Sequence, residues 1–122
     1  MAVAPAHPGS SGPTVYIVYL DDGTKIILNT GEIDYPDGRN GLLRGQPLLA
    51  LRQLVECQGS PVAELVFQER RSIIDVRSTI RRLRDILGDT RKPYRYIVAN
   101  GRLGYYLTRY RLEIFQLPPL VL

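Results

Sequence analysis

The chain has 122 residues, which is enough for one domain and scarcely enough for two. It contains one cysteine and no run of 18 apolar residues, so its composition excludes an internal disulfide, a multi-cysteine zinc site and a membrane-spanning helix. The net charge is +4 but is unevenly placed, because residues 1–69 carry −4 and residues 70–111 carry +9. A strongly basic half within one small domain indicates a surface that faces a polyanion.

The first half of the chain predicts a small antiparallel sheet. Residues 1–13 are rich in proline and glycine and lack a signal-peptide pattern, so we expect a flexible tail. Residues 14–20 and 24–28 are rich in β-branched and aromatic residues around the turn Asp21-Asp22-Gly23, which is typical of a hairpin. Shorter strands are expected near residues 33–35 and 42–43.

Three helices are expected after the sheet. The first spans residues 46–58 with Pro47 in its first turn, and it places Cys57 as a buried structural thiol. The second begins at Ser60 and Pro61 and ends near residue 70. The third runs from a capping Ser72 to about residue 87, before Gly88, and its apolar stripe consists of Val76, Ile80, Leu83 and Leu87.

The basic half ends in a predicted β-hairpin. Extended runs at residues 94–99 and 103–108 flank Asn100-Gly101, a strong signal for a tight turn. Residues 109–117 are compatible with a longer second strand. The order of sheet, three helices and hairpin predicts an α+β winged helix-turn-helix domain with a three-helix core over residues 14–111, followed by an apolar C-terminal tail at residues 112–122.

The sequence offers no catalytic constellation. The only histidine, His7, lies in the tail, so no Ser–His or Cys–His pair can be assembled from the predicted domain. No phosphate-binding loop motif is present. We therefore expect no enzyme activity, no cofactor and no metal site.

The third helix is the strongest candidate binding element. The face opposite the apolar stripe carries Ser78, Arg81, Arg82 and Asp85, and the flanks carry Arg77, Thr79 and Arg84. Such a helix fits the major groove of DNA, where arginine bridges two acceptors of guanine. The alternative is a solvated helix face with an Arg81–Asp85 ion pair.

The tip of the hairpin supplies one more candidate contact. Arg102 follows the Asn100-Gly101 turn, so it is expected to project from the tip. There it could reach a minor groove, whose negative potential attracts arginine, or it could be an ordinary exposed cation.

The segments IDVRSTIRRLRDILGD and YRYIVANGRLGYYL resemble the C-terminal effector domain of the OmpR/PhoB family of response regulators. The residues that carry the resemblance are Ile80, Arg82, Leu83, Arg84, Leu87, Ile97, Gly104 and Tyr105. The resemblance covers roughly residues 14–110 and implies a domain that binds promoter DNA sequence-specifically, often as tandem protomers. The sequence departs from the family in showing no receiver domain before this one, so we expect a stand-alone domain. It also implies DNA contacts by Thr79, Arg82, Arg84 and Arg102.

Two functional hypotheses follow. The first is a bacterial transcriptional regulator that binds double-stranded DNA in the cytoplasm, associated with the nucleoid. The second is a winged-helix protein-interaction module, because residues 113–122 are mostly apolar and carry no cation. That segment could pack on its own domain, on a second copy to form a homodimer, or on another protein such as RNA polymerase.

Overall fold

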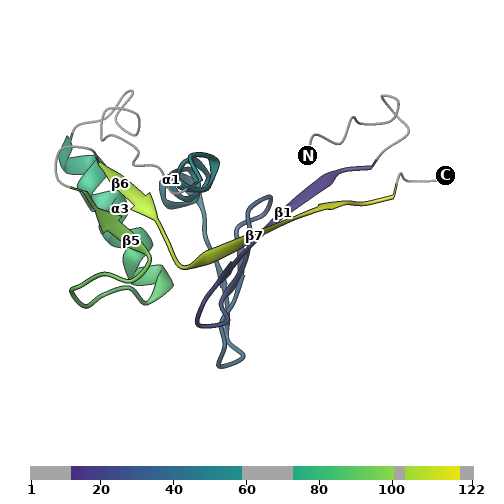
Figure 1. Cartoon of the computed structure of the whole chain (residues 1–122), viewed down its shortest axis with the longest axis horizontal. Helices are drawn as coiled ribbons and strands as arrows, with labels where there is room; N and C mark the ends of the chain where they lie inside the picture. Colours follow the sequence, from purple (N-terminus) through teal and green to yellow (C-terminus); the bar gives the residue numbers. More distant parts are fainter. Residues whose placement is uncertain (1–11, 59–72, 101–103, 119–122) are drawn as a thin grey trace.

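The computed structural model describes residues 12–58, 73–100 and 104–118. Its larger sheet is antiparallel and five-stranded, in the order β4-β3-β2-β1-β7 (Figure 1). These strands are β1 (Thr14–Leu20), β2 (Lys25–Ile27), β3 (Glu32–Asp34), β4 (Asn40–Leu42) and β7 (Tyr110–Gln116). The remaining elements are α1 (Gly45–Glu56), α3 (Ile73–Leu87) and the paired strands β5 (Ile97–Ala99) and β6 (Tyr105–Leu107).

The two described helices form the core together with one face of the sheet. The predicted stripe of α3 is confirmed, because Val76, Ile80, Leu83 and Leu87 are all at most 3% exposed. Helix α1 packs against α3 and β6, and its buried residues are Pro47, Ala50, Leu51, Leu54 and Val55. Each apolar stripe therefore faces the other helix or the sheet, as amphipathic helices require.

The first helix is also tied to the sheet by a polar contact. The Arg52 guanidinium donates to the carbonyl oxygen of Leu28 at 2.7 and 2.9 Å and to that of Asn29 at 3.1 Å. Cys57, at the end of α1, is only half-buried, although it packs against the core as expected.

The three-helix core predicted from the sequence is not confirmed. The described residues contain two helices, and the predicted second helix falls within residues 59–72, outside the described residues. None of the described helices has the length and apolar composition that a membrane-spanning helix requires.

The end of the chain differs from the predicted apolar tail. Arg109 adopts a positive φ of 58°, which turns the chain out of the hairpin, so residues 110–116 do not extend β6. They form β7 and pair with the whole of β1, from Thr14↔Gln116 to Leu20↔Tyr110. The strand therefore crosses the boundary expected at residue 111, because the sheet offers the open edge of β1 to its backbone.

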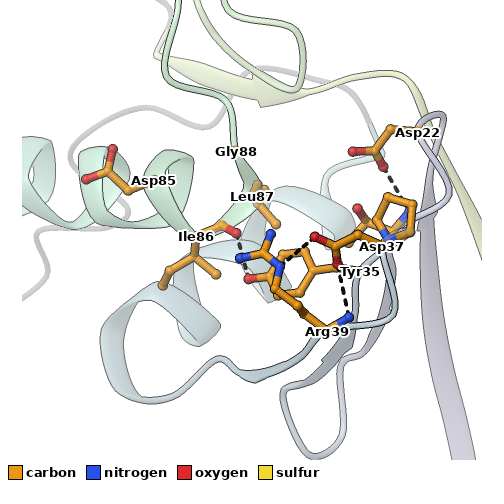
Figure 2. A pocket seen from close by; sticks show the side chains of 10 residues that line it. Asp22, Tyr35, Asp37, Arg39, Asp85, Ile86, Leu87 and Gly88 are labelled. Carbon is orange, nitrogen blue, oxygen red and sulfur yellow. Dashed lines mark hydrogen bonds and ion pairs between the residues drawn. The ribbon is translucent and has the colours of Figure 1, made fainter.

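The C-terminal end of α3 is fastened to the sheet. Gly88 has a φ of +74° and ends the helix as predicted, since glycine adopts this left-handed conformation readily. The Tyr35 hydroxyl, just after β3, donates to the carbonyl oxygen of Ile86 at 2.8 Å (Figure 2). Beside this contact lies an open hollow of about 290 Å³, which Asp37 and Arg39 help to line.

Asp89 joins α3 to the wing, which we define as the paired strands β5 and β6. Its side chain is 3% exposed, and its carboxylate accepts hydrogen bonds from three successive backbone N–H groups. These groups belong to Arg95, Tyr96 and Ile97, at 2.6, 3.0 and 3.0 Å. Three charge-assisted bonds compensate for the burial of the carboxylate and hold the chain that enters β5.

We predict that Asp89→Ala lowers the free energy of unfolding by at least about 2 kcal/mol, because the buried N–H groups of Tyr96 and Ile97 lose their hydrogen-bond acceptor. Urea denaturation monitored by circular dichroism would measure the loss. Asp85→Ala is the matched control, since Asp85 is an exposed acid one helical turn earlier and should change stability little. Equal effects of the two substitutions would contradict this role of Asp89.

Candidate nucleic-acid interface

Helix α3 presents a polar and basic surface on the side opposite its buried stripe. Arg77, Ser78, Arg81 and Arg82 are exposed, and Thr79 is half-buried. The α-helical period produces this separation, because the stripe recurs every three or four residues and leaves the other side of the helix free of core contacts.

Two of these arginines are available to a ligand. Among residues 12–58, 73–100 and 104–118, neither Arg81 nor Arg82 has an ion pair or hydrogen-bond partner through its side chain. The Arg81–Asp85 pair that would make this face self-neutralising is therefore not formed in the described part of the chain. Two neighbouring, uncompensated guanidinium groups favour an anionic partner.

Arg84 lies on the flank of the same helix, but its side chain is bonded to the wing. Its Nε and Nη2 atoms donate to the carbonyl oxygen of Ile97 at 3.0 and 2.9 Å. Its guanidinium carbon lies 3.7 Å from the centre of the Tyr94 ring and 5.9 Å from that of Tyr105. These contacts make Arg84 a residue that positions the wing against α3.

The segment between α3 and β5 extends the basic surface. Arg91, Lys92 and Arg95 are all exposed there. An open hollow of about 550 Å³ separates this segment from the helix, and its lining includes Arg81, Thr90 and Tyr94. Asp85 and Asp89 also line this hollow, and Arg95 is paired with Asp21. The exposed positive charge that this segment adds therefore comes mainly from Arg91 and Lys92.

The wing itself is confirmed as a hairpin. Ile97 lies opposite Leu107 and Ala99 opposite Tyr105, and the Asn100 N–H donates to the carbonyl oxygen of Gly104 at 2.7 Å. The strands are shorter than the extended runs in the sequence, since β5 begins only at Ile97. Arg102, the predicted tip contact, lies outside the described residues.

Asp21, in the turn between β1 and β2, anchors the base of the wing to the sheet. Its carboxylate accepts a hydrogen bond of 2.7 Å from the Tyr96 hydroxyl and contacts Arg95 and Arg109 at 3.1 and 3.5 Å. The Tyr96 hydrogen bond, aided by the two arginines, lowers the pKa of Asp21. Burial and the same hydrogen bond raise the pKa of the Tyr96 hydroxyl, which stays protonated and able to donate.

Sequence reasoning missed the residues that hold this interface in place. The sequence pattern assigned no role to Asp89, and it placed Arg84 among the expected DNA contacts. The positions of both on or just after a helix were readable, but their partners lie on a separate strand. The one local signal for Asp89 was its place in irregular chain after the helix-ending Gly88, since Asp side chains in such segments often accept hydrogen bonds from nearby backbone N–H groups.

Comparison with known proteins relates the fold to solved structures. No protein-family profile matches the sequence, and no curated protein sequence matches it. The chain is similar to a solved structure described as the DNA-binding domain of E. coli CadC, with a TM-score of 0.61 and 19% sequence identity. The similarity covers 83% of this chain and 96% of that one. At this identity the likeness shows the fold, an antiparallel sheet with helices and a wing.

We predict that Arg84→Ala destabilises the protein by about 1–3 kcal/mol, because the Ile97 carbonyl loses its donors and Tyr94 loses its stacking partner. Arg81→Ala, on the same helix, removes an equal charge without a described contact and should alter stability by less than about 0.5 kcal/mol. Thermal and urea unfolding of both variants would separate these roles. A stable Arg84→Ala variant would contradict the positioning role.

We also predict that acid weakens the attachment of the wing at Asp21. Because folding lowers the pKa of Asp21 from its ordinary 3.8, the ionised form stabilises the folded chain above that pH. This stabilisation is lost as the pH falls through the lowered pKa. Asp21→Asn should therefore be less stable than the wild type at neutral pH, and the difference should shrink in acid. A difference in urea stability that stays constant with pH would contradict this assignment.

Proposed function

We propose that the chain is a transcriptional regulator that binds duplex DNA sequence-specifically, with α3 in the major groove and the wing beside it. The observation that carries the proposal is the pair Arg81 and Arg82, which are exposed and have no described partners, on a helix whose apolar stripe is buried on the opposite side. The likeness to a domain that is itself described as DNA-binding supports the same function. A helix of this kind fits the width of the major groove.

Within this proposal the arginines divide into two roles. Arg81 and Arg82 contact bases or phosphates, with Arg77, Ser78 and Thr79 beside them on α3 and Arg102 at the tip of the wing. Arg84 acts indirectly by setting the angle between α3 and the wing, because its guanidinium donors are directed at Ile97.

The exposed cations of the following segment complete the interface. Arg91 and Lys92 would neutralise phosphates on the strand next to the groove, and such contacts position a protein without reading sequence. Affinity should accordingly fall steeply with salt, because each neutralised phosphate releases counterions.

We predict that Arg82→Ala weakens binding to a selected duplex by about 1–3 kcal/mol if Arg82 bridges a guanine. The measurement is fluorescence anisotropy across a salt series, on a duplex selected from a random pool and on an unrelated duplex. A base contact lowers the preference for the selected duplex, whereas a phosphate contact weakens both duplexes and reduces the salt slope by about one.

The matched control is Arg44→Ala, which removes an exposed arginine from the start of α1 rather than from α3. It should leave the preference for the selected duplex unchanged. Binding that does not respond to salt, or an Arg81→Ala/Arg82→Ala double variant that binds like the wild type, would overturn the proposed function.

A further inference from the structure

We propose that the outer edge of β7 pairs with the same edge of a second copy of this chain, which joins two five-stranded sheets into one continuous sheet. This inference concerns β7, which runs away from α3 (Figure 1), and it does not depend on DNA binding. It rests on the exposed backbone edge of β7 and on the order of its side chains.

Within the described part of the chain the outer edge of β7 is unpaired, and β7 is as long as β1, its partner. The strand has seven residues, and among the described strands only β1 pairs with it. Edge strands commonly avoid pairing by being short or by carrying a proline or a bulge. β7 contains no proline, and Ile114 and Phe115 are 60% and 43% exposed.

The direction of the free backbone groups follows from the β1–β7 register. At the two ends of the ladder, the backbone N–H of Asp21 donates to the carbonyl oxygen of Arg109, and the N–H of Leu117 donates to the carbonyl oxygen of Pro13. In an antiparallel pair such bonds alternate along the strand, so the odd-numbered residues of β7 face β1. The N–H and C=O groups of Tyr110, Leu112, Ile114 and Gln116 therefore point outward.

Charge selects one register for pairing of β7 with itself. Antiparallel pairing centred on Leu112 places each Arg111 opposite Glu113 of the other copy. That pair falls at a position without hydrogen bonds, where facing side chains are closest. Centring on Arg111 or Glu113 would instead oppose like charges, which destabilises a sheet.

The same register is favourable for the apolar side chains. Leu112 meets its own counterpart at the two-fold axis, and Tyr110 meets Ile114 of the other copy on the side of the sheet that faces the core. Ile114 would then lose much of its exposed surface to an apolar neighbour. One edge that complements itself in this way forms a closed, two-fold symmetric dimer.

The experiment is sedimentation equilibrium of the full chain without DNA, at the highest concentration at which it stays soluble. The expected mass is twice the 13.8 kDa of one chain. Arg111→Glu alone and Glu113→Arg alone should each weaken self-association by about tenfold or more, because two like-charge pairs form in each dimer. A one-to-one mixture of the two variants should dimerise again, since their charges are complementary.

The mixing step separates the interface from effects within one chain. Arg111 and Glu113 also form an ion pair within each copy, and both single variants lose it equally. Only contact between chains can restore association when the variants are combined. A monomeric wild-type chain at every concentration, or a mixture that associates no better than either variant alone, would overturn the proposal.

A backbone variant tests the edge independently of charge. Ile114→Pro removes an N–H that points away from β1, so it should leave the β1–β7 ladder intact and yield a folded monomer. Ile114→Thr, which keeps the N–H and a β-branched side chain, is its control and should retain the dimer. An Ile114→Pro chain that is folded by circular dichroism and still dimeric would place the contact elsewhere and overturn the proposal.

Discussion

The angle between α3 and the wing depends on the backbone of Ile97. Its N–H donates to the Asp89 carboxylate, and its carbonyl oxygen accepts two bonds from the Arg84 guanidinium. Its side chain is completely buried as well. Because both partners come from the end of α3, the helix and the hairpin form one rigid unit. A groove-binding helix and a wing can contact the same duplex only if their relative position is held in this way.

Arginine guanidinium groups only a few residues apart on α3 have different surroundings and different roles. Arg84 lies beside Tyr94 and faces the first wing strand, so its charge is used inside the protein. Arg81 and Arg82 have no described partner, and their charge is directed at the surroundings. Proximity to β5, rather than residue type, therefore decides which arginines are available to a ligand.

The turn at Arg109 divides the molecule into two structural parts. A positive φ at this residue directs the chain from the wing back along β1, and Asp21 ties this corner to both parts. The basic helix and the wing lie at one end, and the β1–β7 ribbon reaches away at the other (Figure 1). Self-association along β7 would therefore leave the proposed DNA-binding surface exposed and present it twice in one assembly.

The sequence alone determined the elements whose signals are local. The spacing of Val76, Ile80, Leu83 and Leu87 predicted the buried stripe of α3, and Gly88 predicted where the helix ends. The extended runs on either side of residue 100 predicted that the two wing strands pair. Tertiary structure decided that Arg84 and Asp89 hold the wing and that residues 110–116 pair with β1. Those outcomes depend on strands that are distant in sequence, and helical or strand periodicity carries no information about which distant backbone group a side chain will meet.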